Sequence, residues 1–241
     1  MSAPLLRVET AVRRFAGLVA VDHVSLSVDA GEAVGIVGPN GAGKTTLFNL
    51  ISGQLPLSSG RIAFKGEAID GLKPNERARR GIGRTFQVTK PMVGMTTLEN
   101  VMVGAFLRHD RHDAAFEAAY DVLEEVGLAD RAGRPINELT LSERRRLEVA
   151  RALATEPVLI LLDEVMAGLN ATEIDAQISL MRRLAQRGIA FVLIEHNLNA
   201  VRSFCERVAV LDRGAKIAEG TADDVLSDPR VVEAYIGRAR T

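Results

Sequence analysis

A glycine-rich segment early in the chain has the residue types and spacing of a loop that holds phosphate groups. It consists of Gly38, Pro39, Asn40, Gly41, Ala42, Gly43, Lys44, Thr45 and Thr46. Its glycines let backbone amides approach phosphate oxygens without obstruction, and a helix that begins near Lys44 adds its positive end. Lys44 would place a charge on the outer phosphates, and the Thr45 hydroxyl suits Mg²⁺. The apolar run before the loop and the helical pattern after it disfavour a chance glycine-rich turn.

Two carboxylates, Asp163 and Glu164, follow the apolar run Val158 to Leu162. In open α/β sheets, ligands lie beyond the carboxyl ends of the strands, where this pair is expected. Asp163 would hold Mg²⁺ through water, and Glu164 would orient or deprotonate an attacking water. Two acids that merely cap a helix are the alternative, which the phosphate loop in the same chain disfavours.

Three further residues are weaker candidates on spacing alone. His196 follows the apolar run Ala190 to Ile194 by two positions, where a histidine can contact a γ-phosphate, although a structural role fits the spacing equally well. Gln87 follows the stretch Ile82 to Phe86, and Phe15 could stack on a base. Either of these two could instead be an ordinary surface or core residue.

The apolar runs predict the sheet that must position these residues. Ala33 to Val37 leads into the glycine loop, and a helix is expected from Lys44 to Ser52. With Val158 to Leu162 and Ala190 to Ile194, these runs predict strands that are apolar on both faces. Such strands are typical of a parallel sheet covered by helices on each side.

Other segments predict the rest of an α/β fold. Alternating patterns at Leu5 to Arg13, Val24 to Val28 and Gly60 to Lys65 indicate an antiparallel β portion near the N-terminus. From about Thr96 to Pro135 the pattern is helical, and a helix is expected over 114–126. The apolar positions on one face of this helix are Phe116, Ala119, Tyr120, Leu123 and Val126.

We interpret the chain as a single domain with internal parts. Residues 1–95 would form the antiparallel portion and the first part of a nucleotide core, 96–155 an inserted helical subdomain, and 156–241 the second part of the core. Late strands are expected at 208–211 and 215–218, followed by short helices from Ala222 and Pro229.

Composition gives no reason to expect a nucleic-acid partner. The chain has 30 Lys and Arg residues against 31 Asp and Glu residues, for a net charge of -1. The run Arg144, Arg145 and Arg146 cannot share one helix face and is predicted to be a solvated surface. Cys205 is the one cysteine, which excludes an intrachain disulfide and predicts a small buried residue. No secretory signal and no apolar run near the roughly 20 residues of a membrane helix is present, so we expect a cytoplasmic protein.

The order of the motifs resembles that of the ATP-binding cassette (ABC) ATPases over essentially the whole chain. In that family the aromatic residue at the position of Phe15 stacks on adenine, and the glutamine at Gln87 links metal and water to the membrane subunit. Asp163 and Glu164 match the Walker B aspartate and the catalytic glutamate. Residues 167–170 look like the D-loop. His196 matches the switch histidine. The resemblance implies an ATP hydrolase that uses Mg²⁺, with Thr45, Gln87 and Asp163 around the metal.

Two departures from the family pattern stand out. The signature, usually LSGGQ or LSGGE, falls on Leu139 to Glu143, and its glycines are replaced by Leu141 and Ser142. Thr140 retains the hydroxyl that the family presents to ATP on the other subunit, and Ser142 is expected to cap the helix. Leu141 adds bulk where the backbone must come close. Val165 stands where the family usually has proline, which is a milder change.

The resemblance also implies a head-to-tail pair of cassettes that bind two ATP molecules at their interface. ATP joins the pair and hydrolysis releases it, which drives the membrane subunits. The altered signature suggests a heterodimer with unequal ATP sites. The partner would complete the site of this chain with an intact signature, whereas this chain would complete the partner's site with a weakened one. A signature variant that works normally in its own subfamily is the alternative.

Within the family, the chain is most similar to ATPase subunits of branched-chain amino-acid importers. The similarity lies in residues 83–87, 95–104, 145–153, 167–170 and 228–237. Importers of other small polar solutes, such as urea or short amides, share much of this pattern. Expected partners are transmembrane permease subunits, a second ABC ATPase and, indirectly, a solute-binding protein, at the cytoplasmic face of the inner membrane.

Several other classes were weighed. Residues 143–153 and 205–214 also resemble the lipopolysaccharide-export ATPase, which stays an alternative. Non-transport ABC proteins usually fuse two cassettes or insert a long coiled coil, and neither is visible. A GTPase should carry an Asn-Lys-x-Asp motif, which the sequence lacks. The transported solute cannot be deduced, because these ATPases do not touch it.

Overall fold

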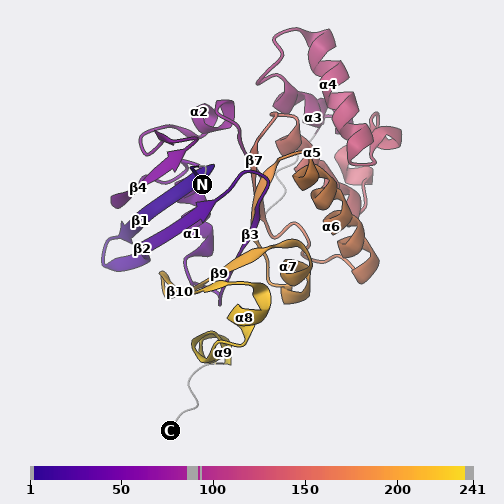
Figure 1. Ribbon diagram of the computed structural model, residues 1–241. Coiled ribbons are helices and arrows are strands. Elements are labelled where there is room, and N and C mark those ends of the chain that lie inside the picture. The colour runs from indigo at the N-terminus through magenta and orange to yellow at the C-terminus, as the bar shows by residue number, and fades with distance from the viewer. Residues whose placement is uncertain (1–2, 86–91, 93, 237–241) are drawn as a thin grey trace.

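The computed structural model describes residues 3–85, 92 and 94–236, and Gln87 therefore lies outside the described residues. One of its sheets is antiparallel, with the strand order β2-β1-β4-β5 (Figure 1). The strands are β1 (Leu6–Phe15), β2 (Leu18–Val28), β4 (Ser59–Phe64) and β5 (Glu67–Ala68). The N-terminal antiparallel portion predicted from the sequence is thus confirmed, and the expected strand at 24–28 is the second half of β2.

The other sheet has the order β10-β9-β3-β8-β7-β6 and carries the nucleotide motifs. Its strands are β3 (Ala33–Val37), β6 (Ile82–Arg84), β7 (Leu159–Asp163), β8 (Ala190–Ile194), β9 (Arg207–Asp212) and β10 (Ala215–Gly220). All neighbours run parallel except β9 and β10. The predicted parallel sheet is therefore confirmed.

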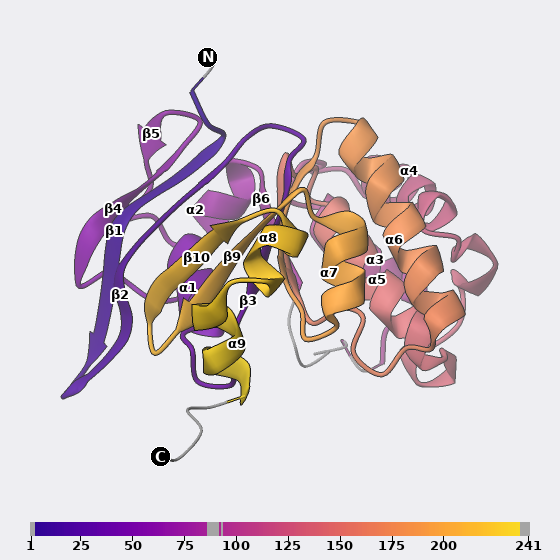
Figure 2. The ribbon, with the colours of Figure 1, turned by 60° about the horizontal axis from the view of Figure 1, so that its bottom comes forward.

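Helices and the antiparallel sheet cover the two faces of this mainly parallel sheet, so its central strands are buried on both sides. In β3, for example, Val34 and Ile36 face a core shared with α1 and the antiparallel sheet, whereas Ala33 and Val37 face a core shared with the later helices. Figure 2 separates the two sides, with α1 and the antiparallel sheet to the left and α5, α6 and α7 to the right. This arrangement explains the continuous apolar runs in the sequence.

The helices predicted from Lys44, over 114–126, and from Ala222 and Pro229 are confirmed. The described helices are α1 (Lys44–Ile51), α2 (Pro74–Arg79), α3 (Thr97–Ala105), α4 (His112–Glu125), α5 (Leu141–Leu153), α6 (Ala171–Gln186), α7 (Leu198–Phe204), α8 (Ala222–Leu226) and α9 (Pro229–Ile236). Helices α3, α4 and α5 pack together at one end of the molecule (Figure 1). No helix in the described part of the chain is long and apolar enough to cross a membrane.

The buried face of α4 differs from the one expected. Ala115, Ala119 and Leu123 are fully buried, whereas Phe116 and Tyr120 are 43% and 37% exposed. The rings of Phe116 and Tyr120 stack on each other with centroids 6.4 Å apart. The buried alanines let α4 approach its neighbours closely, and the two large rings are left at the margin. Ala119, Leu123 and Val126 of the expected face are thus buried, whereas Phe116 and Tyr120 are not, so the buried face is shifted toward Ala115.

The Arg77 side chain of α2 caps the end of α1, which the sequence did not predict. Arg77 is 2% exposed, and its Nη1 donates to the carbonyls of Leu50 and Ile51 at 2.6 and 2.8 Å. These carbonyls are at the C-terminal end of α1, where the regular pairing with an N–H four residues later has ended. The Leu50 carbonyl also accepts from the Gly53 N–H at 3.3 Å. The helix that begins at the phosphate loop is therefore held at its far end by a buried guanidinium.

We predict that Arg77→Ala lowers the free energy of unfolding by roughly 2–4 kcal/mol, because it removes the buried guanidinium that donates to the carbonyls of Leu50 and Ile51. Urea denaturation of the full chain measures the change. Arg79→Ala, an exposed arginine in the same helix, is the control and should stay within about 0.5 kcal/mol of the parent. Equal effects of the two substitutions would contradict the capping role.

Candidate functional site

The phosphate loop connects β3 to α1 and is packed so tightly that two of its glycines have no room for a side chain. A Cβ on Gly38 would lie 2.1 Å from the carbonyl oxygen of Leu211, and one on Gly43 would lie 2.3 Å from that of Ala20. Both glycines also have positive φ values, 146° and 99°. The loop conformation therefore depends on β2 and β9 as well as on its own sequence.

Lys44 points into this loop. It is 6% exposed, and its Nζ donates to the carbonyls of Gly38 at 2.7 Å and Pro39 at 3.0 Å. Burial lowers the pKa of Lys44, and the nearby charges of Glu164 and Asp163 oppose this shift. The ammonium is thus held against two backbone carbonyls of the loop, at the cleft that Lys44 helps to line.

Asp163, at the end of β7, has an oxygen available for a metal ion. The residue is 1% exposed, and its Oδ1 is buried without a hydrogen-bond partner. Burial raises the pKa of Asp163, while Arg84, whose Nη2 lies 3.5 Å from Oδ2, opposes that shift. Carboxylate and hydroxyl oxygens are the ligands that Mg²⁺ prefers. The unpartnered Oδ1 and the exposed Thr45 at the start of α1 fit that ion.

Arg84 was not among the candidates found in the sequence. Its Nη1 donates to Asn49 Oδ1 and Ser52 Oγ at 2.7 Å each, so it ties α1 to the strand end that carries Asp163. The sequence did contain a signal for this role, because Arg84 is a charged residue inside the short apolar segment before Gln87. Pairing of β6 with β7 brings Arg84 opposite Leu161, two residues before Asp163.

Glu164 and His196 form a contact pair at the ends of β7 and β8. Nε2 of His196 lies 3.0 Å from Oε1 of Glu164. The Glu164 backbone has φ 53°, a left-handed conformation that costs a non-glycine residue roughly 1–2 kcal/mol. Its N–H donates to the carbonyl of Ile194 at 2.9 Å. The structure thus brings the predicted base and the predicted phosphate sensor together.

An open cleft of about 650 Å³ joins most of the predicted site residues. Its lining consists of Phe15, Leu18, Val19, Ala20, Asn40, Gly41, Ala42, Gly43, Lys44, Thr45, Thr46, Glu164, His196 and Arg213. Phe15 is 39% exposed, and the Arg13 guanidinium carbon lies 4.5 Å from its ring centroid. One face of a planar base could stack on this ring.

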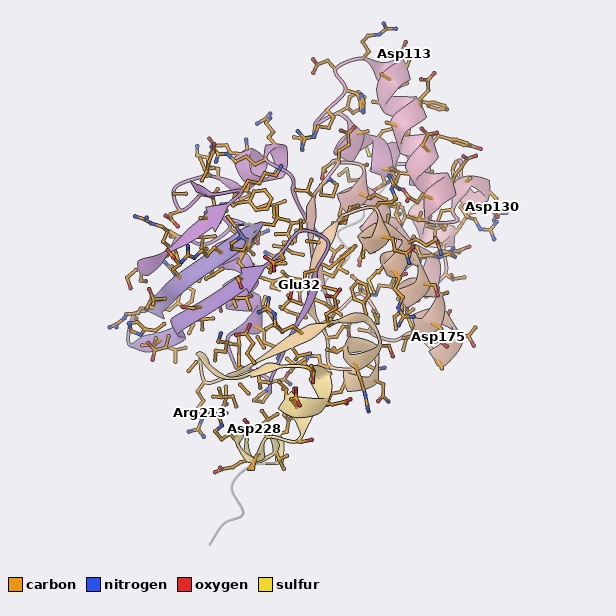
Figure 3. All side chains as sticks on the ribbon, viewed as in Figure 1. Glu32, Asp113, Asp130, Asp175, Arg213 and Asp228 are labelled. Atoms are coloured by element: carbon orange, nitrogen blue, oxygen red, sulfur yellow. The ribbon has the colours of Figure 1, made fainter. Side chains whose placement is uncertain are left out.

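Arg213 is a further lining residue that the sequence did not suggest. It lies in the turn between β9 and β10 and has φ 46° (Figure 3). The neighbouring Gly214 donates to the carbonyl of Ala42, which attaches this turn to the phosphate loop. The positive charge of Arg213, which lines the cleft, favours an anionic ligand.

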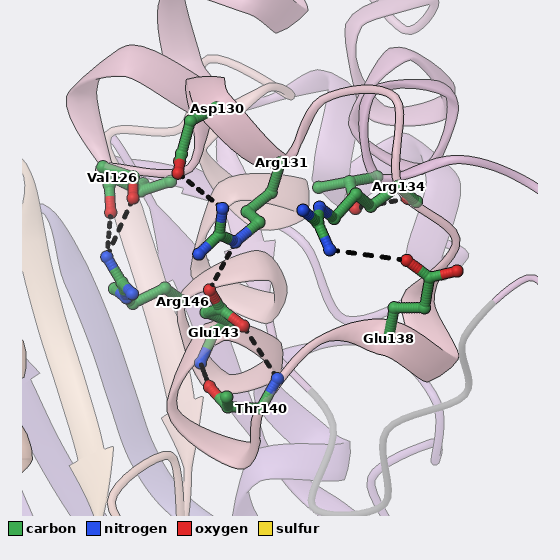
Figure 4. A network of polar contacts seen from close by, with 10 residues as sticks. Val126, Asp130, Arg131, Arg134, Glu138, Thr140, Glu143 and Arg146 are labelled. Carbon is green, nitrogen blue, oxygen red and sulfur yellow. Dashed lines mark hydrogen bonds and ion pairs between the residues drawn. The ribbon is translucent and has the colours of Figure 1, made fainter.

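The start of α5 corrects one prediction, because Thr140 rather than Ser142 caps this helix. Thr140 has extended backbone angles, and its Oγ1 accepts from the Glu143 N–H at 3.2 Å. The Glu143 carboxylate in turn accepts from the Thr140 N–H and from Arg131 Nε, both at 2.8 Å (Figure 4). Ser142 lies inside the first turn, where it cannot act as the cap. Leu141 is 47% exposed and contacts the D-loop, since a Cβ on Gly168 would lie 3.0 Å from its Cδ2.

The arginine run after the signature is not the solvated surface that we predicted. Arg144 donates to the carbonyl of Asn137, Arg145 to the buried Glu148, and Arg146 to the carbonyls of Val126 and Gly127 (Figure 4 shows the last contact). The three side chains do leave the helix in different directions, as the spacing requires. Because α5 packs inside the helical part of the molecule, each direction meets another segment.

Glu195 is a buried acid next to His196 that sequence reasoning passed over. It is 3% exposed, and its Oε1 accepts from the Met166 N–H at 2.8 Å. Burial raises the pKa of Glu195 to about 7. Hydrogen bonds from the backbone N–H groups of Met166 and His196, and the charge of Arg145, act in the opposite direction and lower the pKa. A charged residue at the end of an all-apolar strand was the signal for it.

Comparison with known families gives two matches. Residues 21–167 match the family model described as ABC transporter, and residues 215–241 match the one described as branched-chain amino acid ATP-binding cassette transporter. The first match spans the phosphate loop, the signature region and Asp163 with Glu164. The second spans β10, α8 and α9.

Individual proteins give the same result. A high-affinity branched-chain amino acid transport ATP-binding protein, BraF of Pseudomonas aeruginosa, is 38% identical over 99% of this chain and its own full length. An ATP-binding cassette of an ABC transporter in its ADP conformation has a TM-score of 0.90 at 35% identity, over 98% of this chain and 100% of that one. A dimeric cassette with bound ADP and Pi has a TM-score of 0.81 at 25% identity, over 90% of this chain and 98% of that one.

The raised pKa of Glu195 predicts a pH-dependent stability. Between its ordinary value of 4.5 and about 7, the folded chain binds more protons at this site than the unfolded chain does. The free energy of unfolding therefore falls as the pH rises through this range, by roughly 3 kcal/mol from this group. In Glu195→Gln this cost is absent, so the variant should gain stability relative to the parent between about pH 5 and about pH 8. Urea denaturation across this range measures the difference, and parallel pH curves for the two proteins would contradict the shift.

Proposed function

Because the chain belongs to the family of ABC transporter ATPases, we propose that it is the ATP-hydrolysing subunit of a membrane importer for branched-chain amino acids. One observation carries the ATPase proposal: Phe15, the phosphate loop, Glu164 and His196 line the same cleft. The match of residues 215–241 and the similarity to BraF support the branched-chain class over the lipopolysaccharide-export alternative.

In this proposal the cleft binds ATP along its length. Adenine stacks on Phe15, and the triphosphate lies on the amides of the loop with Lys44 against its outer phosphates. Thr45 and Asp163 would hold Mg²⁺, which would neutralise charge on the β- and γ-phosphates. Gln87 belongs to this set by resemblance and stays a prediction.

Glu164 would act on the attacking water. Its carboxylate orients the water and accepts its proton. His196, whose Nε2 lies 3.0 Å from Glu164 Oε1, would contact the γ-phosphate. The backbone strain at Glu164 fits such a role, because strained residues concentrate where a side chain must be held in one direction. A binding module without turnover would not need this pair.

We further propose that the working unit contains two cassettes and membrane subunits. The cleft is open to one side, and the signature segment of a second cassette would close it over the γ-phosphate, as the family resemblance implies. A groove of about 380 Å³ between the nucleotide core and α3 would receive a permease segment. Its lining includes Ile82, Val103, Leu107 and Arg84. Arg84 also forms an ion pair with Asp163, with Nη2 3.5 Å from Oδ2. The chain would thus be held peripherally at the cytoplasmic face of the membrane.

The altered signature supports unequal sites in a heterodimer. Leu141 projects at the start of α5 and lies against Gly168. By the family resemblance, its bulk would stand where the nucleotide of the partner has to come close. The Thr140 hydroxyl already accepts a hydrogen bond within its own helix cap. The signature segment of this chain would therefore contribute less to the partner's ATP site than the partner's signature contributes to the ATP site of this chain.

The test is steady-state ATP hydrolysis by the full chain assembled with its partner subunits. We predict that Glu164→Gln lowers kcat by roughly 100-fold or more, because the proton acceptor is lost. Ser142→Ala, which leaves the helix cap intact, should change kcat by less than about threefold if the sites are unequal. Thr140→Ser, which keeps the capping hydroxyl, is the control for the integrity of α5. Full activity of Glu164→Gln would refute the hydrolytic role, and equal losses from Glu164→Gln and Ser142→Ala would refute the asymmetry.

A further inference from the structure

Glu195 is a buried carboxylate to which the proposed hydrolysis assigns no task. It is 3% exposed at the end of β8, between the turn that follows β7 and the start of α7. Burying a carboxylate is unfavourable unless hydrogen bonds replace its lost water. The bond that Glu195 accepts from the Met166 N–H, at 2.8 Å, is itself buried.

This hydrogen bond continues the pairing of β7 with β8 beyond the end of the sheet. The ladder of the two strands ends with Asp163 opposite Ile194, and the Glu164 N–H still donates to the Ile194 carbonyl at 2.9 Å. The chain then turns away from the sheet, and the Glu195 side chain provides the next acceptor for that turn. The turn is therefore attached to β8 on both sides of Glu164.

The contacts around the pair Glu164 and His196 form a closed ring. Glu164 Oε1 lies 3.0 Å from His196 Nε2, and His196 is the neighbour of Glu195 along the chain. Glu195 binds the N–H of Met166, which is two residues beyond Glu164. Two side-chain contacts and two short backbone segments thus connect all four residues. A displacement of the turn at Met166 would change the direction of the Glu164 carboxylate.

We propose that Glu195 is a positioning residue, whose hydrogen bond to Met166 fixes the turn after β7 and so sets the Glu164 carboxylate against His196. The left-handed backbone of Glu164, with φ 53°, needs this support, because such conformations persist only where the surroundings hold them. This role rests on the proposed hydrolysis and assigns it a residue outside the ATP cleft.

The groups around Glu195 fit this role in either protonation state. The charged or titratable groups that face it are Arg145 of α5, Glu164, and Cys205 at the end of α7. Both a carboxylate and a protonated carboxyl group keep an oxygen that can accept from the Met166 N–H. The amide oxygen of a glutamine can do the same, which provides a conservative substitution that retains the bond.

The first test compares Glu195→Ala with Glu195→Gln in ATP hydrolysis by the full chain with its partner subunits. Loss of the acceptor in Glu195→Ala should lower kcat by roughly 10- to 100-fold and leave KM for ATP within about twofold, because Glu195 is not among the residues that line the cleft. Glu195→Gln should recover most of that loss. Glu206→Ala removes an exposed carboxylate on the neighbouring segment and is the matched control, with unchanged kcat.

The second test observes His196 directly, by NMR of the histidine side-chain nitrogens in the full chain. The chain has four histidines, so the spectrum is simple, and His196→Gln assigns the signal. Glu195→Ala should shift the His196 resonances and leave the other three in place. Glu195→Gln, which keeps an acceptor for the Met166 N–H, should shift the His196 resonances much less, and Glu206→Ala should shift none of them. This readout needs no turnover, so it decides the inference even if the chain does not hydrolyse ATP.

The proposal is overturned if Glu195→Ala keeps its kcat and its His196 resonances. It is also overturned if Glu195→Gln loses as much activity as Glu195→Ala, or if the loss in Glu195→Ala is matched by a lower folded fraction in circular dichroism. Absence of hydrolysis by the parent chain would instead refute the proposed function, and the NMR comparison would still stand.

Discussion

Parallel pairing of β8 with β3 on one side and with β7 on the other is the constraint on which the site depends. Because the strands run in the same direction, their carboxyl ends meet at one edge of the sheet. The phosphate loop follows β3, the two acids end β7, and His196 follows β8. A register shift of one residue in either pairing would turn buried side chains the wrong way and separate these groups.

The same edge gathers an unusual number of charges that are shielded from water. Lys44, Asp163 and Glu195 are all at most 6% exposed, and Arg84 reaches Asp163 from the neighbouring strand. Buried charges contribute little to stability unless they are paired and hydrogen-bonded. Such a set is therefore better explained by a functional site at this edge than by folding.

Local patterns in the sequence predicted the longer strands, several helices and the phosphate loop, because each of these depends on short-range spacing. Phe15 and His196, which line the same cleft, were singled out through the family resemblance rather than by spacing alone. Local patterns did not predict the cap that Arg77 places on α1, the link from Arg84 to Asp163, or the role of Glu195. These features join residues far apart in the chain, and only the packing of elements brings them together. The surroundings of the arginine run in α5 were missed for the same reason. The subdivision at residues 96 and 155 stays a prediction.

A crystal structure of the chain with ADP and Mg²⁺ tests the central claim most directly. We predict the diphosphate on the amides of residues 41–45, adenine against Phe15, and Mg²⁺ near the Thr45 hydroxyl on the side of Asp163. Nucleotide bound in the groove beside α3, or phosphates that lie away from Lys44, would contradict it.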